Sequence, residues 1–189
     1  MTESWRCFVA VPVGQELRAT LASAVGAWRE RPDLAGLRWS EPESWHLTLA
    51  FLGAVPAADV GRLAEALEAV DRGQEASVLR TGDVGGFPST SRARVAWYGV
   101  SDPAGRLHSL ADSVRRALAL PEAAPVRGHV TLGRARSAPL DLRPWVASAR
   151  PPEGNLVVER VDLMRSHLGR GPARYEVLAT IPLGVGARV

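Results

Sequence analysis

The sequence reads His46-Leu47-Thr48-Leu49 in its first half and His129-Val130-Thr131-Leu132 in its second half. Each stretch lies in an apolar run that favours a β-strand. Side chains alternate between the two faces of a strand, so the histidine and threonine of each stretch point the same way while the apolar residues face a core. The chain therefore presents two matching pairs of an imidazole and a hydroxyl, a combination suited to acid–base chemistry on an anion.

The composition is that of an ordinary globular protein, with 46% hydrophobic and 23% charged residues among 189. This length predicts a single two-lobed domain over residues 1–189. No apolar run reaches the length of a membrane span, and no secretory signal is visible at the N-terminus, so we expect a cytoplasmic location. The single cysteine, Cys7, excludes an intrachain disulfide and a multi-cysteine zinc site.

The chain contains no lysine, so all 23 basic residues are arginine. Without lysine there is no Schiff base, no phosphate-binding-loop lysine and no lysyl adenylate, which excludes ATP-driven ligation through a lysyl intermediate. Arginine suits bidentate recognition of phosphate. The net charge of +3 fits a nucleic-acid partner or, equally, a solvated surface.

Apolar periodicity and turn residues predict an alternation of strands and helices. Strands are expected over residues 6–13, 37–40, 44–51, 76–84, 93–100 and 126–132, with a closing hairpin of residues 156–166 and 174–181 around a turn at 169–172. Helices are expected over residues 15–29 and 59–70, after Asp102-Pro103, and over 142–149, with a loop at residues 85–89. Strand, helix and His-x-Thr strand occur twice in this order, which predicts two lobes of pseudo-twofold symmetry that bring both motifs to one cleft.

Two histidines and two threonines in one cleft can act on a phosphodiester. A neutral imidazole takes a proton from water, and a protonated one gives a proton to a leaving oxygen. The hydroxyls of Thr48 and Thr131 can donate to phosphate oxygens, and Arg134, expected just beyond the second strand, can stabilise negative charge. This set predicts attack of water on a cyclic phosphodiester, and no spacing typical of a zinc site accompanies the histidines.

Several stretches together carry a resemblance to a known family. They are Arg6-Cys7-Phe8-Val9-Ala10, residues 45–53 (WHLTLAFLG), Gly86-Phe87-Pro88, residues 93–97 (ARVAW), residues 128–134 (GHVTLGR) and residues 166–175 (SHLGRGPARY). On these, the chain resembles the two-histidine (2H) phosphoesterase superfamily, and most closely its bacterial and archaeal RNA 2′,3′-cyclic phosphodiesterase branch, also called the 2′-5′ RNA ligase family. The family often has proline before the second histidine, where this chain has Gly128.

The resemblance implies an α+β fold of two lobes, with two antiparallel sheets lining a central cleft and helices on the outside. It implies a reaction without metal or cofactor on RNA 3′ ends or nucleotides that bear a 2′,3′-cyclic phosphate, leaving a 2′-phosphate. We also expect a monomer. By motif position, His46 is the expected proton donor and His129 the proton acceptor. Thr48, Thr131 and Arg134 are expected to bind the phosphate.

Other aromatic and histidine residues receive separate interpretations. Phe87, on the predicted loop, and Phe8 are candidates to stack on a base. Trp97 is expected to pack in the core, and His108 and His167 to be structural or exposed. Two alternatives to hydrolysis remain open: a non-catalytic module that binds nucleotides or RNA ends, and reversible ATP-independent 2′-5′ RNA ligation.

Overall fold

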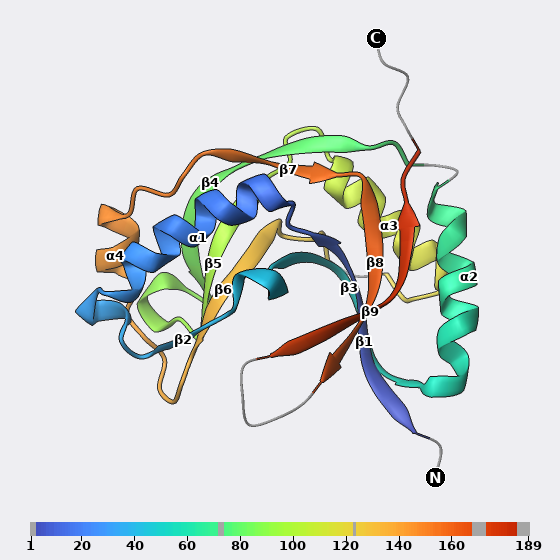
Figure 1. Cartoon of the computed structure of the whole chain (residues 1–189), viewed down its shortest axis with the longest axis horizontal. Coiled ribbons are helices and arrows are strands. Elements are labelled where there is room, and N and C mark those ends of the chain that lie inside the picture. The colour runs from blue at the N-terminus through green and yellow to red at the C-terminus, as the bar shows by residue number, and fades with distance from the viewer. Residues whose placement is uncertain (1–2, 72–73, 123, 168–172, 185–189) are drawn as a thin grey trace.

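A computed structural model describes residues 3–71, 74–122, 124–167 and 173–184. These residues form one curved antiparallel sheet, in the order β7-β4-β5-β6-β3-β1-β8-β9, with β2 paired to β6 off this path (Figure 1). The strands are β1 (Ser4–Pro12), β2 (Leu37–Trp39), β3 (His46–Pro56), β4 (Ser77–Phe87), β5 (Val95–Ser101), β6 (His129–Ala135), β7 (Gly154–Val158), β8 (Arg160–His167) and β9 (Arg174–Pro182).

The sheet consists of two lobes that meet at a narrow seam. One lobe contains β1, β3, β8 and β9, and the other contains β4, β5, β6 and β7 with β2. Between β3 and β6 a single residue pair, Leu47 with Val130, is in register. The predicted α+β fold of two lobes is therefore confirmed, but the two predicted antiparallel sheets are halves of one continuous sheet, because β3 and β6 pair at the seam.

Helices cover the outside of both lobes. Two of them follow a strand of one lobe in the chain but pack against the other lobe. The α-helices among the described residues are α1 (Gln15–Arg29), α2 (Val60–Asp71), α3 (Arg106–Ala117) and α4 (Arg143–Ser148). Helix α1 follows β1 but contacts β7 of the other lobe, and α3 follows β5 but contacts β3 (Figure 1). At the far end of α1, Trp28 packs edge-on against Trp145 of α4 at 5.4 Å. The crossed helices tie the lobes together across the seam.

The alternation predicted for the motif strands is confirmed by burial. Leu47, Leu49, Val130 and Leu132 are at most 1% exposed and belong to the hydrophobic core, whereas the motif histidines and threonines are half-buried. Leu and Val side chains of this kind stabilise the fold by about 1.5–3 kcal/mol each when they are fully buried. The core thus fixes the face on which the polar residues stand.

The loop predicted at residues 85–89 is wrong for its first three residues, which belong to β4. Phe87 is the last residue of β4 and pairs with Val95, the first residue of β5. Gly85 leaves room for the Trp97 ring, which would collide with a Cβ there, and a Cβ at Gly86 would lie 2.7 Å from that of Ala93. These glycines permit close packing against the sheet rather than a turn.

The single strand predicted over residues 156–166 is also wrong, because the chain changes lobe at Glu159. Its first part, β7, pairs with β4, and its second part, β8, pairs with β1 and β9. The predicted hairpin of the last two strands is confirmed by the β8–β9 pairing. Its turn, at residues 169–172, lies outside the described residues.

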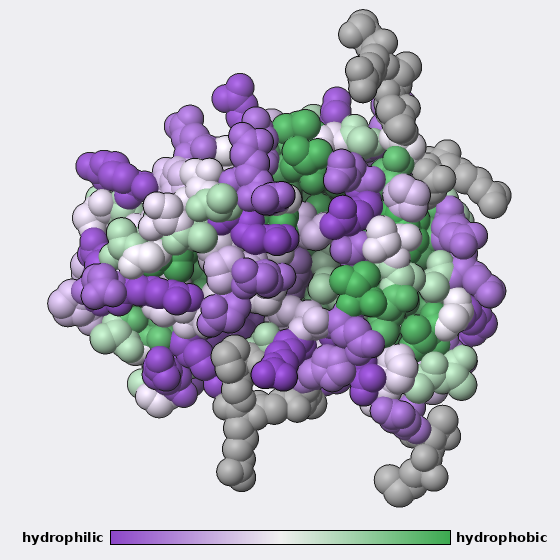
Figure 2. All heavy atoms as spheres, in the orientation of Figure 1, coloured by the Kyte–Doolittle hydropathy of each residue, from purple (hydrophilic) through white to green (hydrophobic). Residues whose placement is uncertain are grey.

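The surface seen in Figure 2 is mostly hydrophilic, with apolar side chains in separate small groups. Large exposed apolar residues are few and lie on different strands: Phe51, Val78, Val157 and Val177. Among the described helices, none is both long enough and apolar enough to cross a membrane.

Candidate active site

The seam brings the two sequence motifs to one point of the sheet. The residue pair Leu47 and Val130 stands in the middle of both motifs and is antiparallel. Continued by one residue in each direction, this register sets each histidine opposite the threonine of the other motif. Both histidines and both threonines line one cavity of about 640 Å³. Residues 83 positions apart in the chain are thus gathered at one site, as the repeated motif predicts.

The polar side chains that line the cavity are cationic or neutral, without a described carboxylate. Arginines from both lobes face it, namely Arg6 from β1, Arg38 from β2 and Arg134 from β6. Its other described polar lining residues are Ser40, Ser44, His46, Thr48, His129, Thr131, Ser166, His167 and Tyr175. A cavity with this lining favours an anion, because cations and hydroxyl donors are not balanced by acidic groups.

Both motif histidines are held by the backbone in the same way. The Nδ1 atom of His46 lies 2.7 Å from the carbonyl oxygen of Ser44, and that of His129 lies 2.7 Å from the carbonyl oxygen of Arg127. A carbonyl oxygen only accepts, so in each ring Nδ1 carries the hydrogen. Nε2 is therefore the atom of each imidazole that remains to take or give a proton.

The surroundings make both imidazoles weaker bases than free histidine. The pKa of His46 is lowered to about 4, chiefly by burial; the hydrogen bond to Ser44 opposes this shift, and the charges of His129 and Arg134 add to it. Burial also lowers the pKa of His129, assisted by Arg127 and Arg134. Both rings are hence neutral at pH 7 in the absence of an anion.

A β-bulge turns Arg134 toward the motif histidines. Strict alternation would put Arg134 on the face opposite Thr131. Pairing with β5 shifts by one residue between Gly133 and Thr131, so Leu132 is the extra residue and is buried together with Gly133. Bulges of this type redirect side chains next to active sites. Arg134 was expected just beyond the strand, but it lies within β6 and faces the cavity because of this bulge.

The other motif strand contains a matching bulge. Pairing of β3 with β1 shifts at Leu49, so that Leu49 and Ala50 are buried in succession and Phe51 faces the cavity. Phe51 follows Thr48 at the same spacing as Arg134 follows Thr131. It is 76% exposed, the most exposed of the large apolar side chains described. The sequence interpretation missed it because a phenylalanine in a strand is normally part of the core.

Aromatic rings surround both imidazoles. Phe8 lies 4.9 Å from the His46 ring and Tyr175 packs edge-on against the same ring at 5.0 Å, whereas Phe87 packs edge-on against His129 at 4.9 Å. Phe8 is only 4% exposed, while Phe87 is half-buried. Stacking of either ring on a base stays a prediction. Tyr175 was not singled out from the sequence because its strand is far from both motifs in the chain.

Four further residues named in the sequence analysis can be compared with their surroundings. Cys7 is 3% exposed and belongs to the hydrophobic core. His108 is exposed and lies 3.3 Å from Asp112 on its own helix. His167 is exposed and lies 2.8 Å from Glu176, but it also lines the cavity. The prediction that Trp97 packs in the core is wrong: the side chain is half-buried outside the core cluster, with its ring over Gly85 and beside Phe87 at 5.5 Å.

Gly128, where the family often has proline, is fixed by β5. The N–H of Val100 donates to the Gly128 carbonyl at 3.0 Å, and a Cβ at Gly128 would lie 2.5 Å from the Val100 carbonyl oxygen. The close approach of the two backbones holds the segment before His129 in place. No group of three or more potential metal ligands occurs among the described residues.

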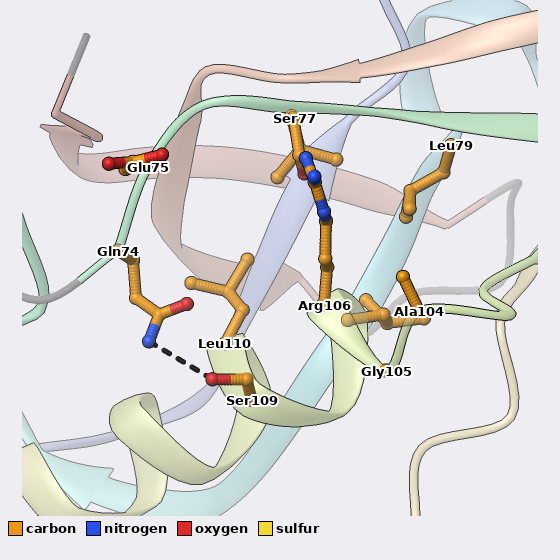
Figure 3. Close-up of a pocket in the computed structure, with 11 residues that line it drawn as sticks. Gln74, Glu75, Ser77, Leu79, Ala104, Gly105, Arg106, Ser109 and Leu110 are labelled. Atoms are coloured by element: carbon orange, nitrogen blue, oxygen red, sulfur yellow. Dashed lines mark hydrogen bonds between the residues drawn. The ribbon is translucent and has the colours of Figure 1, made fainter. Parts of the chain in front are cut away.

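A second cavity, of about 350 Å³, lies at the start of α3 (Figure 3). It is lined by Gln74, Ser77, Arg106 and Ser109 among others, and Gln74 donates to Ser109 across 3.3 Å. The first N–H groups of α3 already donate to the Asp102 carboxylate. An anion therefore has no free helix end to bind there, and the motif cavity is the candidate active site.

Comparison with known proteins agrees with this geometry. Residues 11–97 match the family model described as LigT like Phosphoesterase. In a crystal structure of E. coli LigT complexed with 3′-AMP, the fold aligns over 96% of this chain and 99% of that one, with a TM-score of 0.72 and 29% identity. Fold and site thus define a phosphoesterase of the LigT type.

Curated relatives make the assignment more specific. The RNA 2′,3′-cyclic phosphodiesterase of Archaeoglobus fulgidus is 34% identical over 69% of this chain and 73% of its own length. That of Geobacillus stearothermophilus is 27% identical over 93% of this chain, which spans 56% of that longer protein. The chain belongs to the RNA 2′,3′-cyclic phosphodiesterase family.

Proposed function

We propose that the protein hydrolyses a 2′,3′-cyclic phosphate, at an RNA 3′ end or on a nucleotide, to a 2′-phosphomonoester without a metal ion. The observation that carries the proposal is the pair of imidazoles in one cavity, each with Nδ1 fixed by a backbone carbonyl, with no carboxylate among the described lining residues. The pairing supplies one proton acceptor and one proton donor for a single phosphorus atom.

The proposed reaction is an in-line displacement at phosphorus. His129 Nε2 takes a proton from water as the water oxygen bonds to phosphorus. The bond from phosphorus to the 3′ oxygen breaks, and His46 Nε2 gives that oxygen a proton. Thr48 and Thr131 donate to the non-bridging oxygens, and the Arg134 guanidinium stabilises the negative charge of the transition state.

The low pKa of His46 requires that the substrate help to protonate it. In the free protein this ring is neutral near pH 7, because its pKa is about 4. A bound cyclic phosphate places a negative charge beside the ring, and an adjacent opposite charge favours the imidazolium. The proposal thus includes a proton that arrives with the anion, after which the ring can serve as donor.

One chain can provide the whole site, which supports the proposal that the protein acts as a monomer. Both lobes contribute a motif histidine, a threonine and an arginine to the same cavity. We likewise propose that the lobes form one domain, since the crossed helices and the common core would not survive their separation. A single unfolding transition of the full chain, and elution at the monomer mass, are the expected results.

The direct test is hydrolysis of nucleoside 2′,3′-cyclic phosphates in the presence of EDTA, with the product identified by its phosphate position. Turnover to the 2′-phosphate that persists in EDTA supports the proposal, and activity abolished by the chelator contradicts the metal-free mechanism. Tight binding without product would favour a binding module instead. An assay with 2′,3′-cyclic phosphate and 5′-hydroxyl ends, without ATP, tests the alternative of ligation.

A further inference from the structure

Two arginines from distant parts of the chain stand directly opposite each other at one end of the active-site cavity. Strand β2 adds to the edge of β6 with Leu37 opposite Ala135, Arg38 opposite Arg134, and Trp39 opposite Gly133. Side chains in such cross-strand pairs leave the backbone about 5 Å apart. Both arginines are exposed, and both line the cavity that contains the motif histidines.

The position of β2 is closely fixed. Leu37 is 2% exposed and anchors the strand in the core. Gly133 allows the backbones to approach, since a Cβ there would lie 3.0 Å from the Arg38 carbonyl oxygen. The N–H of Ser40 donates to the Leu132 carbonyl at 2.8 Å just beyond the strand. The fold therefore fixes the backbone positions from which Arg38 and Arg134 extend.

Like charges directly opposite each other on a sheet are destabilising unless an anion lies between or beside them. Neither Arg38 nor Arg134 forms an ion pair with a carboxylate of the described residues, and none of the described residues lining the cavity is acidic. Nothing described in the protein neutralises the pair. A ligand with more than one negative charge would do so.

The two arginines differ in their relation to the imidazoles. The charge of Arg134 lowers the pKa of both His46 and His129, so its guanidinium is within electrostatic range of both rings. Arg38 has no such effect on either ring. Arg134 is the cation whose charge reaches both imidazoles, whereas Arg38 stands beside it on the neighbouring strand β2 and lines the same cavity.

We propose that Arg38 binds a second phosphate of the substrate, namely the phosphate on the 5′ side of the nucleotide whose 2′,3′-cyclic phosphate is opened. This inference rests on the proposed function and specifies its substrate: an oligonucleotide end, or a nucleotide with a 5′-phosphate, is preferred to a bare nucleoside 2′,3′-cyclic phosphate. Guanidinium groups bind phosphate through two parallel N–H donors, which the exposed Arg38 side chain can offer.

The experiment compares three substrates that share one base. They are a nucleoside 2′,3′-cyclic phosphate, the same compound with a 5′-phosphate, and a dinucleotide ending in the cyclic phosphate. We expect kcat/KM to be higher for the two substrates with a second phosphate, and this preference to fall about tenfold in Arg38→Gln, the loss of one charged hydrogen bond. The slope of log kcat/KM against log salt should become shallower by about 0.7 for those substrates.

Matched variants separate a phosphate subsite from a general effect of charge or folding. Arg136→Gln removes a charge one residue beyond the end of β6 and outside the cavity lining, and should leave the substrate preference unchanged. Arg38→Lys keeps the charge and should retain more of the preference than Arg38→Gln. A loss with the 5′-phosphate alone, or with the dinucleotide alone, shows whether Arg38 binds this 5′-side phosphate as a monoester or as an internucleotide diester.

Three results would overturn the inference. The first is a wild-type protein that hydrolyses the nucleoside substrate without any gain from a second phosphate, which contradicts the subsite while the proposed function stands. The second is an unchanged preference in Arg38→Gln. The third is loss of the preference in Arg6→Gln but not in Arg38→Gln, which would put the second phosphate on the opposite lobe. Absence of hydrolysis with every substrate would instead contradict the proposed function.

Discussion

The two motif strands, β3 and β6, share a framework and differ in what they present. In both, a histidine and a threonine face the cavity, a bulge follows, and the next side chain to face the cavity comes three residues after the threonine. That side chain is Phe51 on β3 and Arg134 on β6. A repeated backbone pattern thus positions two acid–base groups alike while it assigns an aromatic surface to one lobe and a cation to the other.

The two imidazoles also differ in their neighbours. His46 packs against two aromatic rings, Phe8 and Tyr175, and burial lowers its pKa to about 4. His129 packs against Phe87, whose ring also lies 5.2 Å from the Arg127 guanidinium. Both histidines have the same Nδ1 hydrogen bond, but their rings have different neighbours. Different surroundings can give two chemically identical side chains different pKa values and separate roles.

The largest expected effect comes from removing either imidazole. If both act on the same phosphorus, His46→Ala and His129→Ala should each lower kcat/KM for a nucleoside 2′,3′-cyclic phosphate by about 10²–10⁴-fold. His108→Ala, which removes an exposed histidine on α3, should leave activity unchanged. A large loss in one motif variant with a loss below tenfold in the other would break the equivalence of the two strands.

The second expected effect concerns pH, and its sign follows from the lowered pKa values. One ring must be neutral and the other protonated, so kcat/KM should be bell-shaped between a rising limb near pH 4, set by His46, and a falling limb below pH 6.5, set by His129. Above the falling limb, activity should decline about tenfold per pH unit, since both rings are then neutral. A plateau from pH 6.5 to 9 would contradict this.

Arg134 provides the third comparison. Arg134→Gln removes a charged donor from the phosphate and should lower kcat/KM by about 10–100-fold, mainly through kcat. Arg134→Lys should recover part of the loss. If Arg134→Gln changes KM alone, the guanidinium binds the substrate but does not stabilise the transition state.

The corresponding position on the other strand should give a smaller and different effect. Phe51→Ala removes an exposed ring on which a base can stack, and we expect KM to rise about tenfold with kcat nearly unchanged. Phe51→Trp, which keeps a stacking surface, is the matched control. A fall in kcat without a change in KM would show that Phe51 positions the motif strand instead of the substrate.

Much of the fold could be predicted from local pattern. The helix over residues 15–29, the short helix within 142–149, and the inward Leu and Val residues of both motifs are confirmed, because periodicity and helix-breaking residues act over a few positions. The features that were missed depend on distant partners. The bulge at Leu132 exists only because β5 pairs on both sides of it, and the change of lobe at Glu159 has no local signal.

The candidate site likewise contains residues that local sequence predicts and residues that depend on distant partners. The histidines and threonines could be singled out because they repeat a spacing, and Arg134 because it closely follows the second motif. Arg38 and Tyr175 could not, because their place in the cavity depends on a three-residue strand added to β6 and on the last strand of the sheet. The residues next to Arg38 and Tyr175 in the sequence do not indicate that either side chain lies near the motif histidines.

The seam between β3 and β6 is one residue pair wide, and that pair sits between the histidine and the threonine of each motif. A rotation of one lobe against the other would therefore pivot close to the reacting atoms. Points near a pivot travel little while distant rims swing widely, so the mouth of the groove could widen for a bulky polynucleotide with the two imidazoles still at nearly the same separation. The entrance of the groove would then change in width with little change in the geometry of the two reacting imidazoles.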